Sequence, residues 1–296
     1  MQHTERSHRV KFSERHFTMN GVDLNVAASD APGPPLLLLH GVTRCWRDYL
    51  DVIPGLAGFG QVIALDHRGH GGSPGGHDHY RVRDCVEDAV AFLRAEISEP
   101  AVLIGHSLGA MTAATIAARV PQRVRGLVLE DPPGSLLASG IQESRYWLQF
   151  TGLRILLFSQ AWEAWELAEA LAKLPVQHPL DGRTVLWSEL RDPAALRFAA
   201  ECLARMDPRV LDDLVEGRWL EDLDWFAELS NIRCPTLLLH ADSLCGGMLA
   251  ESEALRVESG IRQCKRVDFP QLGHNLHGTA PARYLDEVTR FLQDIS

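Results

Sequence analysis

The chain has 296 residues, of which 46% are hydrophobic and 23% are charged. This length and composition exclude disorder, collagen and coiled coil as descriptions of the whole chain. The formal net charge is −10. Such an acidic surface repels phosphate backbones and anionic lipid, so we expect neither nucleic acid nor a membrane as a partner.

The sequence lacks the features that predict export or membrane insertion. No run reaches the roughly 18 to 20 apolar residues that cross a bilayer, and the polar residues 1–17 contain no apolar core of a secretory signal. The six cysteines form no C-x-x-C pair, which favours free thiols in a reducing compartment over a disulfide framework. The expected localisation is cytoplasmic.

Short apolar runs alternate with segments of helical spacing. Strands are expected at residues 22–28, 36–40, 61–65, 101–104, 124–129, 235–240 and 267–269. Helices are expected at residues 80–97, 108–120 and 283–292. Short runs that are apolar throughout are typical of strands buried on both faces. The alternation predicts an α/β fold with a mainly parallel sheet.

The alternation stops between residues 134 and 232, where helical spacing replaces strand patterns. Apolar residues at helical spacing over 158–174 predict one apolar helix face. The segment also holds six of the seven tryptophans, at positions 147, 162, 165, 187, 219 and 225. We predict a core domain of residues 1–133 and 233–296 and a helical cap of residues 134–232. The favoured interpretation of these tryptophans is packing between the helices of the cap, and some could also line an apolar pocket.

A candidate nucleophile lies between a predicted strand and a predicted helix, in the motif Gly105-His-Ser-Leu-Gly109. A nucleophile elbow turns so sharply that the residues two before and two after the serine must be small. The turn would place the Ser107 hydroxyl at a helix N-terminus, where backbone N–H groups stabilise negative charge.

A serine hydroxyl needs a base to remove its proton. Among the thirteen histidines, His274 is the favoured base because it follows the last predicted strand and precedes the final helix. His277 is the alternative, although a polar cap or a supporting role suits it better. A carboxylate must then orient the imidazole. Asp242 and Asp131 both end predicted strands, and Glu130 is a weaker third choice.

The segment His40-Gly-Val-Thr43 also follows a predicted buried strand. Its Val42 N–H and the Leu108 N–H are the expected donors of an oxyanion hole. Residues 66–79 contain four histidines and two aspartates, but their spacing matches no reliable metal motif and glycines dominate. A glycine-rich loop is the better interpretation, and we expect no metal there.

Together these motifs resemble those of the α/β-hydrolase fold family. The matching segments occur in the family's order and cover nearly the whole chain: His40-Gly41, residues 66–73, 105–109 and 235–240, and Gly273-His274. The resemblance implies an eight-stranded, mostly parallel sheet with a helical cap inserted after the sixth strand.

The resemblance leaves the acid ambiguous. In many relatives the acid lies four residues beyond the histidine that ends the seventh strand, where this chain has Leu244. Asp242 lies only two residues beyond His240. In some relatives, such as certain dehalogenases and a mycotoxin lactonase, the acid instead ends the sixth strand, as Asp131 does here. Asp242 is preferred because its arrangement is the commoner one, and Asp131 is the alternative.

The resemblance also argues against two chemistries. Epoxide hydrolases and haloalkane dehalogenases carry aspartate at the elbow, where this chain has Ser107, and epoxide hydrolases usually carry proline at the place of Thr43. We therefore predict a serine hydrolase that needs no cofactor and cleaves a small, largely apolar ester, such as a monoester or lactone. The alternatives are a C–C bond hydrolase of aromatic ring-cleavage products and a non-catalytic receptor for a small ligand. The sequence leaves open whether the protein forms a homo-oligomer.

Overall fold

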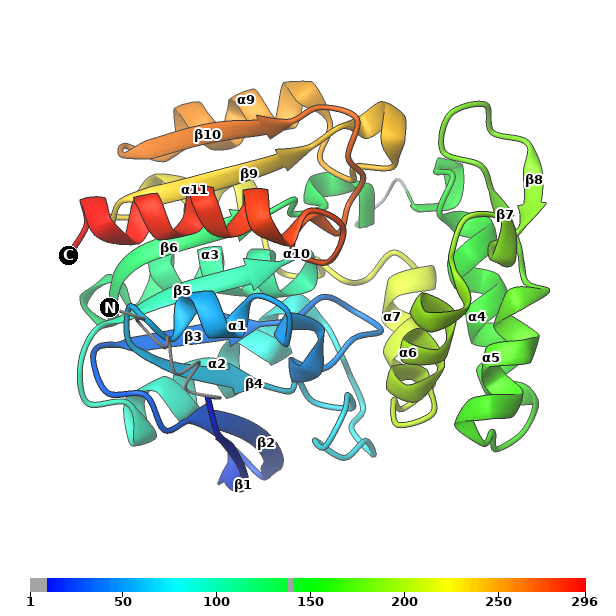
Figure 1. Ribbon diagram of the computed structural model, residues 1–296, viewed down its shortest axis with the longest axis horizontal. Helices are drawn as coiled ribbons and strands as arrows, with labels where there is room; N and C mark the ends of the chain where they lie inside the picture. The colour runs from blue at the N-terminus through cyan, green and yellow to red at the C-terminus, as the bar shows by residue number, and fades with distance from the viewer. Residues whose placement is uncertain (1–9, 138–140) are drawn as a thin grey trace, which may run out of the picture.

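The computed structural model describes residues 10–137 and 141–296. Its centre is an eight-stranded sheet in the order β1-β2-β4-β3-β5-β6-β9-β10 (Figure 1). These strands are β1 (Phe12–Met19), β2 (Val22–Ser29), β3 (Pro35–Leu39), β4 (Gln61–Leu65), β5 (Ala101–His106), β6 (Val124–Glu130), β9 (Thr236–Ala241) and β10 (Cys264–Phe269). The pairs β1–β2 and β2–β4 are antiparallel, and all others are parallel. The predicted α/β sheet is confirmed.

The strand β1 was not predicted. It forms one edge of the sheet, and most of its side chains are exposed, so it lacks the apolar run that marks the buried strands. It pairs with β2 through a tight turn in which Asn20 and Gly21 have φ values of 52° and 79°. Two successive positive φ values define the turn that joins strands in a right-twisted hairpin.

Helices cover both faces of the sheet (Figure 1). The core helices are α1 (Ile53–Leu56), α2 (Val82–Glu96), α3 (Leu108–Arg119), α9 (Glu251–Gly260), α10 (Leu276–Thr279) and α11 (Pro281–Asp294). Successive β3 leucines show the alternation: Leu37 and Leu39 pack in the cluster of α2 and α3, whereas Leu36 and Leu38 pack in the cluster of α1 and α11. Among the described residues, no helix is long and apolar enough to cross a membrane.

Most of the chain between β6 and β9 lies beside the carboxyl ends of the parallel strands (Figure 1), and its last helix packs against α3. It contains α4 (Trp147–Ser159), α5 (Ala164–Ala172), α6 (Pro193–Leu203), α7 (Val210–Val215) and α8 (Trp225–Glu228). We use the term cap for residues 134–232, the predicted span. The cap also contains an unpredicted pair of three-residue strands, β7 (Pro175–Gln177) and β8 (Thr184–Leu186). Strands this short leave no periodic pattern in the sequence.

One prediction for the cap is wrong. Residues 158–174 do not share one apolar helix face, because α4 ends at Ser159 and α5 starts at Ala164. Because of this break, residues of α4 and residues of α5 do not continue on one helix face. Leu167 and Leu171 are fully buried, whereas 64% of the Trp165 surface is exposed.

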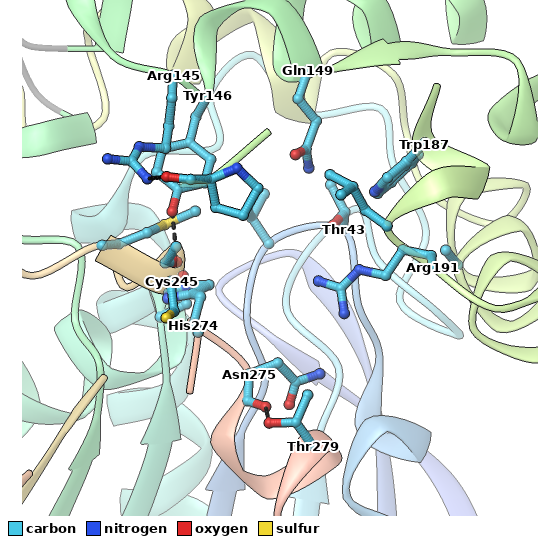
Figure 2. A pocket seen from close by; sticks show the side chains of 18 of the residues that line it. Thr43, Arg145, Tyr146, Gln149, Trp187, Arg191, Cys245, His274, Asn275 and Thr279 are labelled. Carbon is cyan, nitrogen blue, oxygen red and sulfur yellow. Dashed lines mark hydrogen bonds between the residues drawn. The ribbon is translucent and has the colours of Figure 1, made fainter. Parts of the chain in front are cut away.

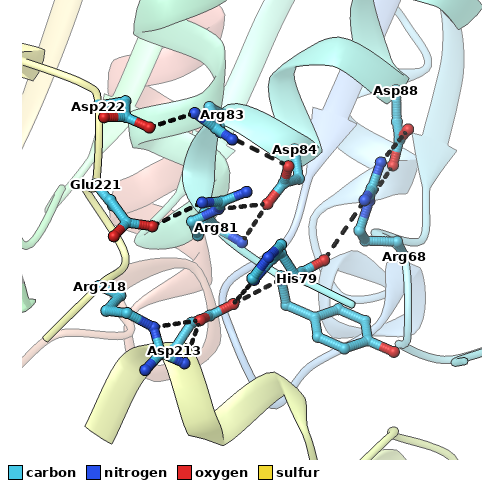
Figure 3. A network of polar contacts seen from close by, with 11 residues as sticks. Arg68, His79, Arg81, Arg83, Asp84, Asp88, Asp213, Arg218, Glu221 and Asp222 are labelled. Carbon is cyan, nitrogen blue, oxygen red and sulfur yellow. Dashed lines mark hydrogen bonds and ion pairs between the residues drawn. The ribbon is translucent and has the colours of Figure 1, made fainter. Parts of the chain in front are cut away.

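Ion pairs and hydrogen bonds attach the end of the cap to the start of α2 (Figure 3). Arg81 Nη1 lies 2.7 Å from Glu221 Oε2, and Arg83 Nη1 lies 2.6 Å from Asp222 Oδ2. The Tyr80 N–H donates to Asp213 Oδ2 at 2.8 Å. These contacts join α7 and the following turn to the core, so the position of the cap over the strand ends is held from one side.

Candidate active site

Ser107 lies in a sharp turn between β5 and α3, as predicted for a nucleophile elbow. Its φ and ψ values are 54° and −117°, which lie outside the regions that a serine ordinarily adopts. A Cβ on Gly105 would lie 2.2 Å from the Gly109 carbonyl oxygen, and one on Gly109 would lie 1.8 Å from the Leu39 carbonyl oxygen. Only glycine therefore fits at either place.

His274 lies in the loop after β10, and its ring faces Asp131. The distance from His274 Nδ1 to Asp131 Oδ2 is 2.6 Å. The backbone of the same loop is also held, because the His274 N–H donates to the Gly246 carbonyl at 3.2 Å. Ser107 and His274 line one cavity, so the structure brings the predicted nucleophile and the predicted base together.

The preference for Asp242 as the partner of His274 is corrected to the alternative, Asp131. The Asp242 carboxylate accepts hydrogen bonds from the Leu244 N–H at 2.9 Å and from the Gln271 N–H at 3.0 Å. It therefore caps a turn and ties together the loops that follow β9 and β10. An aspartate directly after a strand often accepts hydrogen bonds from the backbone of its own turn.

Burial and hydrogen bonds fix the position of the Asp131 carboxylate. It is fully buried, and its φ of 41° turns the chain as it leaves β6. Its carboxylate also accepts from the Met248 N–H at 2.8 Å and the Leu249 N–H at 3.4 Å. Three donors thus surround the buried carboxylate, which stabilises its charge and fixes its orientation toward His274.

Glu130 and His277 form a separate buried cluster with Asp48. His277 Nδ1 lies 2.8 Å from Glu130 Oε2, and His277 Nε2 lies 3.2 Å from Asp48 Oδ2. Burial alone would lower the pKa of His277, but the two carboxylates outweigh it and raise that pKa to about 10. Glu130 also accepts from the Leu276 N–H at 2.7 Å, so this cluster supports the start of α10 rather than facing Asp131.

This cluster makes stability depend on pH. The folded pKa of His277 lies above its ordinary value, so its contribution is complete below about pH 6.5 and is lost as pH rises toward 10. His277→Gln should lower the free energy of unfolding at pH 6 by about 3 to 5 kcal/mol, because it leaves two buried carboxylates without their cation. The deficit should shrink in urea titrations at pH 9. His16→Gln, at an exposed pair with Asp23, is the matched control and should leave the free energy of unfolding unchanged at both pH 6 and pH 9.

The expected oxyanion donors lie beside Ser107. The loop after β3 approaches so closely that a Cβ on Gly41 would lie 3.2 Å from Ser107 Cβ. Within the described chain, neither the Val42 N–H nor the Leu108 N–H donates to a backbone group. Two such donors next to a serine are what a developing oxyanion requires.

Two supporting residues escaped the sequence analysis. His106 precedes the serine, and its Nε2–H donates to the His274 carbonyl at 3.1 Å. Burial lowers the pKa of His106 to about 3, so this ring is neutral. Tyr146 of the cap donates its hydroxyl proton to the Gly246 carbonyl at 2.6 Å. Both hold the loops around His274, and no sequence pattern distinguishes them from other buried polar residues.

The cavity above Ser107 has a volume of about 390 Å³ and is walled by core loops and by the cap. Its lining is mixed and not apolar throughout, because apolar side chains such as Phe150, Leu203 and Met248 share it with charged ones. Trp187 is the only tryptophan among the described lining residues, and three arginines, Arg44, Arg145 and Arg191, also line the cavity. Figure 2 shows Trp187, Arg145 and Arg191. Trp219 and Trp225 are instead fully buried, so these two pack inside the protein and not on the cavity wall.

The histidine-rich loop of residues 66–79 contributes nothing to the described cavity lining. Its Asp66 accepts from the Trp46 N–H at 2.6 Å and from the Gly72 N–H at 2.8 Å, and thus holds the loop against the core. Across the described ranges, no group of three or more histidine, cysteine, aspartate or glutamate side chains is arranged to bind a metal ion.

Comparison with known sequences decides the family. Residues 34–281 match the alpha/beta hydrolase fold family. The chain belongs to this family. This agrees with the resemblance inferred from the motifs. Epoxide hydrolase B of Mycobacterium tuberculosis is 36% identical over 124 residues, which cover 39% of this chain and 35% of that protein. A 2-hydroxymuconate semialdehyde hydrolase of Pseudomonas sp. strain CF600 is 38% identical over 124 residues, covering 40% and 44%.

Solved structures agree on the fold of this family member. The crystal structure of E-2-(acetamidomethylene)succinate hydrolase superposes with a TM-score of 0.74 at 21% sequence identity, covering 96% of this chain and all of that one. The curated relatives above match over less than half of their own lengths. The names of these relatives indicate different substrates, so membership of the family indicates a hydrolase in general. The particular reaction must be argued from the site.

Proposed function

We propose that the protein is a serine hydrolase that cleaves a small carboxylic ester through an acyl-enzyme. The observation that carries this proposal is Ser107, which lies in a nucleophile elbow and lines the same cavity as His274, whose ring is paired with Asp131. A hydroxyl, an imidazole and a buried carboxylate in this order constitute the groups that acyl transfer requires.

In the proposed mechanism Ser107 Oγ attacks the ester carbonyl while His274 Nε2 takes the hydroxyl proton. Asp131 accepts from Nδ1–H, which leaves Nε2 as the basic nitrogen and stabilises the imidazolium. The Val42 and Leu108 N–H groups bind the oxyanion. His274 then protonates the leaving alcohol, and a water molecule activated by the same ring cleaves the acyl-enzyme. No hydrogen bond links Ser107 Oγ to His274 within the described residues, and such bonds often tighten only when substrate binds.

The alternative of C–C bond hydrolysis is supported by the similarity to 2-hydroxymuconate semialdehyde hydrolase over 40% of this chain. Epoxide hydrolysis has weaker support despite the similarity to epoxide hydrolase B, because Ser107 stands where that chemistry needs a carboxylate nucleophile. A receptor on the same fold would bind a ligand without turnover. A panel of 4-nitrophenyl esters, a lactone, a phthalate monoester and a 2-hydroxy-6-oxo-dienoate separates these possibilities.

A fluorophosphonate provides the direct test of the nucleophile. We expect Ser107 Oγ to displace fluoride and form a phosphonyl ester, because the elbow presents an activated hydroxyl to the oxyanion donors. Mass spectrometry of the digested protein should locate one adduct on the peptide that contains Ser107, with parallel loss of ester turnover. A protein that remains unlabelled, or one labelled only elsewhere, would contradict the proposed function.

A further inference from the structure

The cavity carries a charge opposite to that of the chain. The whole sequence has a net charge of −10, yet three arginines and no aspartate or glutamate are among the described residues that line the cavity. A concave site with low-dielectric walls concentrates the field of such charges and attracts ions of the opposite sign. The cavity is therefore suited to an anion, in contrast to the largely apolar substrate expected from the sequence.

Two of the three guanidinium groups already have partners. Arg44 Nε lies 3.9 Å from Asp48 Oδ1, and the Arg44 guanidinium lies over the Phe198 ring at 5.9 Å from its centroid. Arg145 donates from Nη1 to the Pro179 carbonyl, a neutral acceptor. Both arginines are thus partly satisfied by the walls of the cavity.

Arg191 differs from both. Its guanidinium points into the cavity between the cap and the loops of the core (Figure 2). Within the described residues its side chain makes no ion pair or hydrogen bond, and the adjacent Asp192 carboxylate instead caps α6 by accepting from the Ala194 and Ala195 N–H groups. Partial removal from water and the nearby Arg44 charge lower the pKa of Arg191, against the opposing charges of Asp48 and Asp192, and a guanidinium stays protonated at neutral pH. The Arg191 side chain is exposed, so its guanidinium is accessible to an anion that enters the cavity.

We propose that Arg191 is the specificity-determining residue of this site and binds a carboxylate of the substrate. The substrate class is then a carboxylate-bearing ester, such as the monoester of a dicarboxylic acid. The planar guanidinium can bind both carboxylate oxygens. Neutral amides stand nearby on the same walls, from Gln149 and Asn275 (Figure 2). This inference rests on the proposed hydrolysis at Ser107 and deepens it.

The test uses matched anionic and neutral esters. For the acyl side, 4-nitrophenyl monoesters of adipate, suberate and sebacate are compared with esters in which an isopropyl group replaces the free carboxylate. For the alcohol side, 4-butyryloxybenzoate is compared with 4-isopropylphenyl butyrate. The wild-type protein should prefer an anionic member, and the arm in which it does so locates the carboxylate.

Arg191→Gln should then lower kcat/KM for the preferred anionic ester by about 10- to 100-fold, mainly through KM, because a charge-assisted bond to the substrate is lost. The neutral isostere should change by less than about threefold. Arg191→Lys should lie between the two because it keeps the charge but not the fork of donors. Arg197→Gln removes the same charge from α6, the helix that follows Arg191, at a position outside the cavity lining, and should leave the turnover of both esters unaffected.

Failure of this inference can be distinguished from failure of the proposed function. If Arg191→Gln slows the anionic ester and its isostere equally, or if no anionic ester is preferred, the anion site is refuted while ester hydrolysis stands. If no ester is turned over, titration calorimetry with suberate still decides the anion site. Binding to the wild type that Arg191→Gln abolishes and Arg197→Gln retains supports it, and equal or absent binding overturns it.

Discussion

Replacing Ser107 by alanine should lower ester turnover by about 10⁴- to 10⁶-fold, because no other group can form the acyl-enzyme. The fold should be unaffected, since alanine fits the space of serine and Ser107 makes no side-chain cap bond at the start of α3. The measurement is kcat with the best ester of the panel, together with the thermal unfolding midpoint. A residual rate above water is still expected from the oxyanion donors and from binding.

The control for this variant is Ser230→Ala, at an exposed position whose hydroxyl donates to the Ala227 carbonyl at 3.3 Å. It should match the wild type in turnover and in unfolding midpoint. Wild-type turnover by the Ser107→Ala protein would refute the mechanism in which Ser107 is the nucleophile. Equal loss of folding and of activity would point to the strained elbow backbone, so the two measurements must be made on the same preparation.

The core was predictable because its strands are buried on both faces. Residues 36–39 and 101–104 are apolar throughout, and such runs have few alternatives to a central parallel strand. The elbow was predictable for a similar reason, since Gly105 and Gly109 satisfy a steric requirement that the sequence displays directly. In both cases the local sequence carries the whole constraint.

The cavity lining was not predictable, because its residues come from segments without a periodic signal. Arg191 lies just before α6, and Arg145 lies two residues before α4. In the sequence, arginines at such positions resemble ordinary solvent-exposed charges next to a helix. Only the packing of the cap on the core brings them to the cavity of Ser107. The tryptophans left the lining open, because a large apolar side chain can pack inside the protein or on the wall of a cavity, and Trp219 and Trp225 are buried.

The sequence-based preference for Asp242 over Asp131 was wrong for a reason unrelated to periodic patterns. Both aspartates follow strands that end at the same edge of the sheet, so topology places both near His274. The outcome depends on backbone geometry within a few residues: Asp131 leaves β6 with a positive φ, whereas Asp242 folds back onto the Leu244 N–H. A general preference in a family cannot supply that local detail.

Asp131→Asn should therefore lower turnover by roughly 10⁴-fold, with substrate affinity largely retained. The asparagine amide can donate to His274 Nδ1, which would move the ring proton to Nε2, the nitrogen that must accept from Ser107. The buried Met248 N–H bond would compete for the amide oxygen and favour this orientation of the amide. The measurement is kcat at pH 7 to 8 with the best ester of the panel.

Asp242→Asn is the matched control, because it changes the same atoms on the same edge of the sheet. The amide oxygen can keep one of the two N–H bonds that the carboxylate accepts from Leu244 and Gln271, so turnover should fall by less than about tenfold. The reverse pattern, with Asp242→Asn inactive and Asp131→Asn close to wild type, would show that the acid is the aspartate after β9. Since both variants remove one negative charge from the same edge of the sheet, the contrast between them reports on the contact with His274 and not on the net charge of the protein.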